Sequence, residues 1–211
     1  MWRIARLFRQ TRPRKRVTLW TGPGFHVIYY PLRNRSEVNI VVAVKVPAAL
    51  QATDNQGYRN HIELLIKDAQ AEPREAVVLV NLARRWSIAD RNPIRQWHDG
   101  NVTLIGNAAH ATLQSYAQGA GMALEDAVIL ADLVEEHGDD HSEAFRRFNS
   151  RRFLRTARLQ LESRTLWEEF HCGGIKAEAW TLRFVQRQAV DHYRCLVWLW
   201  TPELHQYQPQ P

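Results

Sequence analysis

The sequence predicts an α+β fold in which antiparallel strands come first and long helices follow. Three observations support this prediction. Segments rich in β-branched and aromatic residues, separated by turn residues, fill the region from Val17 to Val46. An apolar segment, Val102–Ile105, leads through a loop of small residues into a helical pattern. After residue 137, apolar residues recur at helical spacing over a long stretch.

The first region contains three predicted strands, Val17–Trp20, Phe25–Pro31 and Val38–Val46. The residues between them accept tight backbone geometry, because Thr21–Gly24 contains Gly and Pro, and Asn34–Ser36 contains Asn and Ser. Short connections of this kind join antiparallel neighbours, so the three strands are expected to form one antiparallel set.

The second of these strands contains a histidine and a tyrosine at even spacing. Successive side chains of a strand point to opposite faces of the sheet, so His26, Ile28 and Tyr30 are expected on one face. A histidine and a tyrosine in a sheet usually satisfy local hydrogen bonds, and the spacing alone does not assign them any chemistry.

The segment that follows is polar, with apolar residues at the spacing of a surface helix: Ile62, Leu65, Ile66 and Ala69. Val77–Leu82 is a short apolar run that fits either a helix or a strand. Turn residues predict a loop at Asp90–Pro93, and the strand Val102–Ile105 is expected to be buried.

The densest signal in the chain follows that strand. Gly106–His110 comes directly after it, and Gln118–Met122 opens a helix whose apolar face is expected at Leu124, Ala127, Val128, Ala131 and Val134. Small residues let backbone amides approach a ligand, and a helix N-terminus favours anionic or electron-rich groups. Tight packing between strand and helix would require the same small residues. Gly119–Gly121 also begins like GxGxxG, but Leu124 stands at its last position, so the dinucleotide fingerprint is not met.

A polar break at His137–His141 precedes the last helical region, in which Ser142 is predicted to cap a long helix. Two histidines and two aspartates resemble a metal cluster in composition, but no further ligand is suggested and no metal site is predicted. Near the C-terminus, Trp198 and Trp200 are expected to pack in a core.

The charge of the chain is concentrated at its N-terminus. The formal net charge is +6, with 28 basic and 22 acidic residues. Seven of the basic residues lie among the first 16 residues, so the rest of the chain has 21 basic against 22 acidic residues and a net charge of −1. Nucleic-acid binding is therefore not predicted for the body of the chain.

The basic segment itself, residues 1–16, has three interpretations. An amphipathic targeting peptide would be rich in arginine, but it would also favour serine, and the first serine is Ser36. Phosphate attraction to the clustered cations is the second interpretation. A solvated, poorly ordered end is the third, and it is favoured.

The remaining composition limits the class of protein. The chain has two cysteines, Cys172 and Cys195, without the spacing of a zinc site, which is typical of thiols in a reducing compartment and predicts a cytoplasmic protein. No run of about 18 apolar residues predicts a membrane-spanning helix.

Five blocks of the sequence together resemble the flavin-dependent aromatic hydroxylases, the single-component FAD monooxygenases related to salicylate hydroxylase and 3-hydroxybenzoate 6-hydroxylase. The blocks are Leu19–Arg33, Trp97–His110, Ala117–Ala127, Arg155–Gln160 and Trp198–Trp200. The middle blocks are the most specific, because a strand, a GD-type turn, Ala-Ala-His, Gln-Gly-Ala and a helical Glu-Asp pair occur together.

The resemblance implies roles for particular residues. Cofactor contacts to FAD are implied for Gly106, Asn107, Ala108, Gly119, Ala120 and Gly121. In the family the strand that carries His26 and Tyr30 faces the flavin ring, and a glutamine at the position of Gln114 reaches the substrate pocket. His26 would accept the phenol proton, Tyr30 would orient the phenol and Gln114 would hold it. An imidazole suits that task because it can take up a proton near neutral pH, and a phenolate is a better nucleophile than a phenol.

The sequence departs from the family pattern in three places. It has no GxGxxG motif, so the resemblance implies a partial flavoprotein hydroxylase fold that lacks the N-terminal Rossmann βαβ unit. Asn107 replaces the aspartate of the GD motif, which removes an anionic acceptor and is expected to weaken FAD binding. Ala111 stands where the family usually has proline, so the following loop is expected to be less rigid.

Four segments are expected: the leader 1–16, part of a substrate domain at 17–96, the C-terminal part of an FAD-binding domain at 97–136 and a helical region at 137–211. The expected function is that of a truncated aromatic hydroxylase acting on a phenolic acid with FAD and NAD(P)H, weak or inactive alone. The alternative is a non-catalytic module that does not bind FAD. Self-association, or a complementing N-terminal half, is expected for the exposed interface.

Overall fold

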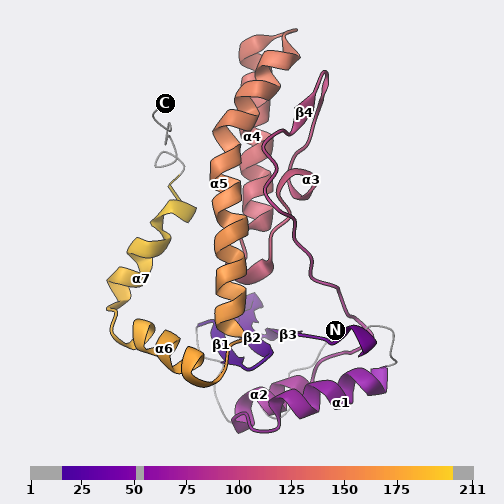
Figure 1. Ribbon diagram of the computed structural model, residues 1–211, viewed down its shortest axis with the longest axis vertical. Helices are drawn as coiled ribbons and strands as arrows, with labels where there is room; N and C mark the ends of the chain where they lie inside the picture. The colour runs from indigo at the N-terminus through magenta and orange to yellow at the C-terminus, as the bar shows by residue number, and fades with distance from the viewer. Residues whose placement is uncertain (1–15, 51–54, 202–211) are drawn as a thin grey trace. The chain divides into compact units, whose positions relative to one another are not determined.

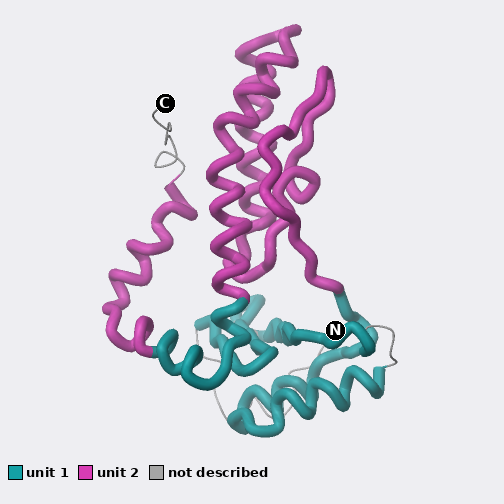
Figure 2. Tube along the Cα trace, in the orientation of Figure 1, with its two compact units in different colours: residues 1–86, 168–181 teal, residues 87–167, 182–211 magenta. Residues whose placement is uncertain are grey.

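The computed structural model describes residues 16–50 and 55–201, which form two compact units. The first unit comprises the chain up to Trp86 together with Glu168–Thr181, and the second comprises Ser87–Trp167 and the chain from Leu182 onward (Figure 2). Both units are therefore discontinuous in sequence. Except for Arg16, the basic segment predicted to be poorly ordered lies outside the described residues.

The first unit contains a three-stranded antiparallel sheet in the order β1-β2-β3 (Figure 1). Its strands are β1 (Thr18–Gly22), β2 (Phe25–Leu32) and β3 (Glu37–Val44), close to the predicted segments. The β1–β2 turn needs Gly24, whose φ of +79° is costly for other residues. A short 3-10 turn, Arg33–Arg35, joins β2 to β3.

One face of this sheet packs against two helices, α1 (Asn55–Ile66) and α2 (Ala71–Val78). The core between them is apolar and consists of Phe25, Val27, Ile62, Ile66, Ala76, Val77 and Leu82. Phe25 and Val27 alternate with His26, so the register directs His26 to the opposite face. The ambiguous run Val77–Leu82 forms the end of α2 and the turn after it.

The second unit is built on two long helices that lie side by side, α4 (Gly119–His137) and most of α5 (His141–Phe170) (Figure 1). A two-stranded hairpin precedes them, formed by β4 (His98–Asp99) and β5 (Val102–Thr103), followed by the short helix α3 (Asn107–His110) and a 3-10 turn, Gln114–Tyr116. The core of the unit contains Trp97, Ala109, Leu133, Ala144 and Phe148.

Three short helical elements follow α5. They are α6 (Gly174–Val185), which begins in the first unit, α7 (Ala189–Leu196) and the 3-10 turn Val197–Leu199. Trp198 and Leu199 of that turn are buried with Met122 and Leu159 in a second small core of the second unit, as predicted for Trp198. Trp200, in contrast, is more than half exposed, so its predicted place in a core was wrong.

Two predictions about local structure in the second unit were also wrong. The strand predicted at Val102–Ile105 is only two residues long, and Val102 is exposed because its sole partner among the described residues is the neighbouring strand β4. The cap of α5 is Asp140 rather than Ser142, since Asp140 Oδ1 accepts the backbone N–H of Glu143.

The predicted buried face of α4 was wrong as well. Leu124 and Val128 are 70% and 61% exposed, whereas Met122, Asp126 and Leu133 are buried. The helix has apolar residues on more than one side, so periodicity alone could not select the inner one. The selection depends on the partners of Asp126, which lie on α5 and in the loop before α4.

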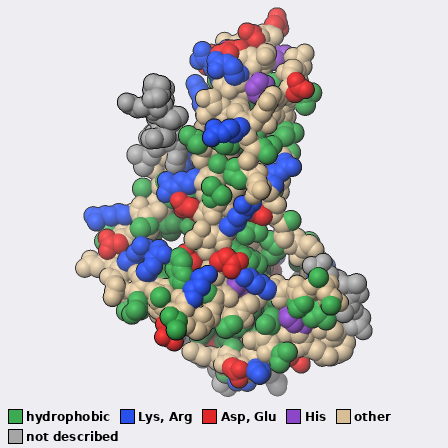
Figure 3. Space-filling view, in the orientation of Figure 1, with side chains coloured by type: hydrophobic (Ala, Val, Ile, Leu, Met, Phe, Trp, Pro, Cys, Tyr) green, Lys and Arg blue, Asp and Glu red, His purple; other side chains and the backbone are tan. Residues whose placement is uncertain are grey.

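No helix in residues 16–50 or 55–201 combines the length and the apolar character needed to cross a membrane. On the face of the molecule shown in Figure 3, basic side chains lie in separate groups with other side chains between them.

Candidate functional site

The first group of predicted site residues lies on the face of the sheet that α1 and α2 leave uncovered. His26 of β2 is 4% exposed, and Tyr30, four residues further on the same strand, is half-buried. The register pairs His26 with Thr21 and Ala43, and Tyr30 with Asn39. The predicted shared face of His26 and Tyr30 therefore follows from the observed strand register.

His26 has a direct partner that the sequence did not reveal. Its Nδ1 lies 3.1 Å from Nε2 of His171, which follows the last residue of α5 and is 5% exposed. The ring of Phe170 meets the His26 ring edge-on at a centroid distance of 5.4 Å. Burial, and secondarily repulsion by His171, lower the pKa of His26 to about 4. At neutral pH His26 is therefore uncharged, and its pKa lies well below the near-neutral range that was expected for the base.

The second group of predicted residues lies in the second unit, at the junction between β5 and α4. Gly106 has φ +54° and ψ −136°, and a Cβ there would lie 3.3 Å from Cβ of Ala123. Its backbone N–H donates to Oδ2 of Asp126 at 2.9 Å. Gly106 is thus required both by its backbone conformation and by close contact with α4.

A buried ionic network fixes this junction. Asp126 accepts hydrogen bonds from His110 Nε2 and from Arg152 Nε, each at 2.6 Å, and all three side chains are at most 1% exposed. Burial raises the pKa of Asp126, but the bonds from His110, the Gly106 amide and Arg152 outweigh it, so the net shift is downward. The carboxylate is charged at neutral pH and joins the loop, α4 and α5.

His110 Nδ1 is buried and has no hydrogen-bond partner among the described residues. For His110 Nδ1 the state without a hydrogen is the less costly one, because a buried N–H with no acceptor would lose a full hydrogen bond. We therefore place the hydrogen of this ring on Nε2, where it faces Asp126.

Glu125 extends the network toward the C-terminal part of the unit. Arg155 binds its two carboxylate oxygens through Nε and Nη2 at 2.7 and 2.6 Å, and Arg152 Nη1 adds a third bond at 2.6 Å. Arg155 also donates to the carbonyl oxygens of Trp198 and Leu199. This two-pronged geometry is specific to Arg, so the block Arg155–Gln160 has a structural role in addition to its place in the resemblance.

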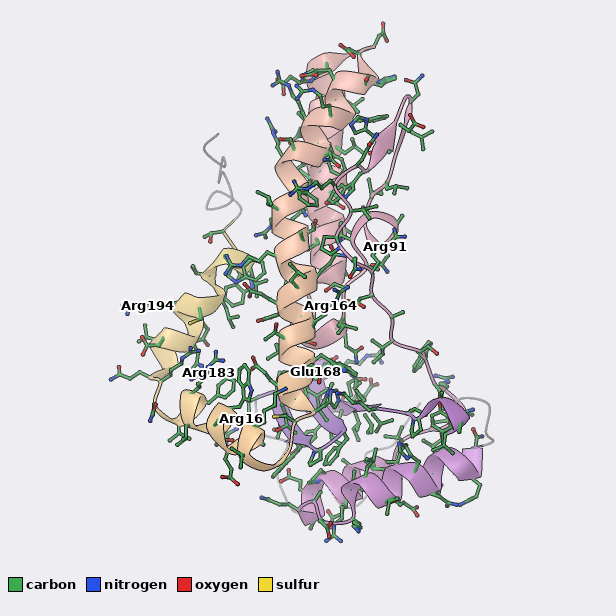
Figure 4. All side chains as sticks on the ribbon, in the orientation of Figure 1. Arg16, Arg91, Arg164, Glu168, Arg183 and Arg194 are labelled. Carbon is green, nitrogen blue, oxygen red and sulfur yellow. The ribbon has the colours of Figure 1, made fainter. Side chains whose placement is uncertain are left out.

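Further contacts hold the loops on α5, on which Figure 4 labels Arg164. Arg164 binds the side chains of Asp90 and Asn92, and Gln160 Nε2 donates to the carbonyl oxygens of Arg91 and Ala111 at 2.9 and 3.1 Å. The carbonyl of Ala111 is thus anchored although proline is absent there.

The start of α4 has the features expected of an anion-facing helix terminus. Its N-cap residue Gln118 makes no capping hydrogen bond through its side chain, and the first turn contains no acidic residue. The turn consists of the small residues Gly119, Ala120 and Gly121, and the first N–H groups of a helix have no partner within the helix. Nearby in sequence, Asn107 is exposed, and its side chain has no hydrogen-bond partner among the described residues.

The predicted residues fall into both units. His26 and Tyr30 belong to the first, whereas Gln114, Asn107 and the glycine-rich start of α4 belong to the second. Gln114 is exposed on its 3-10 turn. Its approach to His26 and Tyr30 stays a prediction.

No metal site was predicted, and no group of three or more potential ligands occurs within residues 16–50 and 55–201. The polar break has structural contacts instead, since His137 Nδ1 lies 2.9 Å from the Leu133 carbonyl oxygen and Asp140 caps α5.

Comparison with known proteins identifies a family and several relatives. A family model described as an FAD binding domain matches residues 7–193. The 3-hydroxybenzoate 6-hydroxylase 2 of Aquipseudomonas alcaligenes is 36% identical over 183 residues, which cover 87% of this chain and 57% of the relative. The 3-hydroxybenzoate 6-hydroxylase of Polaromonas naphthalenivorans is 34% identical over 87% of this chain and 46% of its own length. The chain thus spans about half the length of these relatives.

Solved structures agree on the fold. HpxO of Klebsiella pneumoniae, crystallised with FAD and uric acid, superposes with a TM-score of 0.77 at 22% identity, with 92% of this chain and 49% of the other chain covered. A salicylate hydroxylase substrate complex gives a TM-score of 0.62 at 20% identity, with 90% of this chain and 48% of the other chain covered.

Proposed function

The chain belongs to the FAD-binding domain family that includes the flavin-dependent aromatic hydroxylases, and from this membership we propose that it serves in hydroxylating a phenolic acid such as 3-hydroxybenzoate or salicylate. The observation that carries the proposal is the buried, neutral His26 on the sheet face that also holds Tyr30. FAD would be the cofactor, molecular oxygen the oxidant and NAD(P)H the reductant. This chain would supply the substrate-facing sheet and the flavin-facing loop and helix.

His26 would accept the hydroxyl proton of the substrate. A phenol has a pKa near 10, as tyrosine does, so it is neutral at pH 7 unless a base takes its proton. The phenolate is richer in electrons at the ring and reacts more readily with an electrophilic oxygen. Tyr30, on the same face, would orient the substrate hydroxyl, and Gln114 would hold the aromatic acid.

The residues present fit the flavin-proximal part of FAD. Asn107 offers an exposed amide to the sugar-alcohol hydroxyls, and the first-turn amides of α4 at Gly119, Ala120 and Gly121 favour an anionic or electron-rich partner. When bound, FAD supplies the activation of molecular oxygen. The chain's own part is to present Gly106, Asn107 and Ala108 in a fixed conformation through the bond from Gly106 to Asp126.

An apolar surface supports the need for a further segment. Ile105, Leu124 and Val128 are 43%, 70% and 61% exposed around the junction between β5 and α4. We propose that a GxGxxG-bearing βαβ half, in the same polypeptide or a separate one, covers this surface and binds the ADP part of FAD. The same surface favours a second candidate function, a non-catalytic module that associates with itself or with another protein.

A flavin titration tests the proposal. We expect the chain alone to bind FAD weakly, because it contains no GxGxxG motif. Co-expression with the GxGxxG half of a 3-hydroxybenzoate 6-hydroxylase should restore stoichiometric flavin absorbance and NAD(P)H oxidation that depends on the phenolic acid. His26→Gln should abolish hydroxylation while flavin binding remains, and His141→Gln, an exposed histidine on α5, is the matched control.

Two outcomes would contradict the proposal. Failure of the co-expressed halves to bind flavin, together with a concentration-dependent homodimer in light scattering, would favour the non-catalytic module. Hydroxylation by His26→Gln at the unaltered rate would remove His26 from the reaction.

A further inference from the structure

The contact between His26 and His171 joins residues 145 positions apart in the sequence, both nearly excluded from solvent. The centroids of the two imidazole rings are 4.9 Å apart and the planes are tilted by 41°. At 3.1 Å between Nδ1 of His26 and Nε2 of His171, one nitrogen must donate a hydrogen and the other must accept it. The contact therefore couples the tautomers of the two rings.

The backbone that carries His171 is fastened to the sheet beside His26. The N–H of Gly24, in the β1–β2 turn, donates to the carbonyl oxygen of His171 at 3.0 Å. Gly173 packs so closely on the same turn that a Cβ there would lie 2.7 Å from Cγ of Pro23. Two contacts with the β1–β2 turn thus fix the chain at and just after His171, and its ring is not a loosely placed surface group.

We propose that His171 is a positioning residue for His26: its Nε2 accepts the hydrogen of His26 Nδ1 and so keeps Nε2 of His26 in the proton-accepting form. The reverse arrangement, with His171 as donor, would place the hydrogen of neutral His26 on Nε2 and prevent that nitrogen from taking the substrate proton. This inference rests on the proposed function, in which His26 is the base. It follows the general rule that a base is oriented by a third group on its other side.

The proton movement is balanced within the pair. The substrate O–H bond breaks, its proton joins Nε2 of His26, and the electron pair stays on the phenolate oxygen. The resulting imidazolium has its Nδ1–H directed at His171 Nε2, which stabilises the positive charge and can take the Nδ1 proton. Burial, and secondarily repulsion by His171, lower the pKa of His26 to about 4, so the imidazolium is costly in this site and its Nδ1–H needs an acceptor.

Charged groups also lie near the His171 side of the pair. Glu168, one turn earlier in the chain, has a lowered pKa that results first from its bond with Lys45 and to a smaller degree from Lys176 and His171 (Figure 4). On the sheet side, the residues that pair with His26 are the uncharged Thr21 and Ala43.

The first test measures the tautomer of His26 in the chain itself, without flavin or substrate. Histidine labelled with 15N should show the hydrogen of His26 on Nδ1 at neutral pH. His171→Gln should keep it there, because a glutamine oxygen can accept the same bond, whereas His171→Phe should move it to Nε2. His141→Gln is the control and should change nothing. A wild-type protein with the hydrogen on Nε2 overturns the proposal, even if His171→Phe fails to fold.

The second test measures substrate ionisation in the flavin-loaded complex of the chain with its complementing half. The phenolate absorbance of bound 3-hydroxybenzoate should fall about tenfold in His171→Phe, the loss expected for one buried hydrogen bond, while benzoate binding changes less than about twofold. His171→Gln should recover most of the signal. An unchanged phenolate signal in His171→Phe would overturn the inference and leave the proposed function standing. Absence of the signal in the wild type, with the expected tautomer present, would count against the proposed function alone.

Discussion

Asp126→Asn tests the buried network that fixes the flavin-facing loop on α4 and α5. The substitution keeps the shape of the side chain and removes its charge. Asp126 is fully buried and accepts three hydrogen bonds: Oδ2 takes those of Gly106 and His110, and Oδ1 takes that of Arg152. Asparagine has one acceptor oxygen. If that oxygen faces Gly106 and His110, its amide N–H₂ must face the N–H of Arg152, and two donors then meet.

The cost follows from these contacts. Removing one partner of a buried ion pair destabilises a protein by about 3–5 kcal/mol, because the other charge stays buried. Arg152 keeps a bond to Glu125 at 2.6 Å and one to the Met122 carbonyl oxygen at 3.1 Å, so its charge is not left alone. We therefore expect the lower end, a loss of about 3 kcal/mol in the free energy of unfolding.

Urea unfolding followed by far-UV circular dichroism measures this loss, since the unit is mainly helical. Glu143→Gln is the matched control: Glu143 pairs with Arg146 and Arg147 at the protein surface, and its removal should leave the unfolding midpoint unchanged. Adding Arg152→Met to Asp126→Asn should recover part of the loss, because the asparagine N–H₂ then no longer faces the N–H of Arg152. A loss below about 1 kcal/mol for Asp126→Asn, or an equal loss for Glu143→Gln, would refute the reasoning.

Three further predictions concern the two sites. The pKa of His26 is about 4 in the folded chain and 6.5 as its ordinary value, so the unfolded state takes up a proton first as the pH drops. The free energy of unfolding should fall through this window, by about 3 kcal/mol at pH 4. Unfolding curves at several pH values should show a smaller slope for His26→Gln, and an identical slope would contradict the prediction. Gly106→Ala should lower the free energy of unfolding by about 1–3 kcal/mol in a denaturant titration, because φ is +54° and Ala123 is close. Gly100→Ala is the control and should cost less, because Gly100 has φ +52° but open space around it. Equal costs would mean that the contact with Ala123 is unimportant. Asn107→Asp should tighten FAD binding severalfold in a fluorescence titration of the complemented protein. Asn101→Asp in the hairpin is the control and should not tighten it. No difference between the two variants would argue against a flavin contact at residue 107.

The strands were predictable from the sequence because strand geometry is local. The β-branched and aromatic segments and their turns located β1, β2 and β3 to within a few residues, and the period of two placed His26 and Tyr30 on one face. The sequence blocks around Gly106 and Gly119 also led to the correct family, because their order of strand, loop and helix is specific.

The inner side of α4 was not predictable in the same way. Its sequence offers apolar residues on several sides, and the prediction chose Leu124 and Val128 over the side that contains a charged residue. Asp126 is nevertheless the buried one, since Arg152, His110 and the Gly106 amide neutralise and bind its carboxylate. A buried charge is stable only with such partners, and partners distant in sequence leave no periodic signal.

The sequence by itself therefore determined the α+β class, the antiparallel sheet, the shared face of His26 and Tyr30 and the family. Only the tertiary structure decided that His171 meets His26, and that Asp126 joins the loop to α5. The physical reason is the range of the interactions. Backbone geometry repeats every two or 3.6 residues and can be read along the chain, whereas the contact of His26 with His171 requires the chain to fold back over 145 residues.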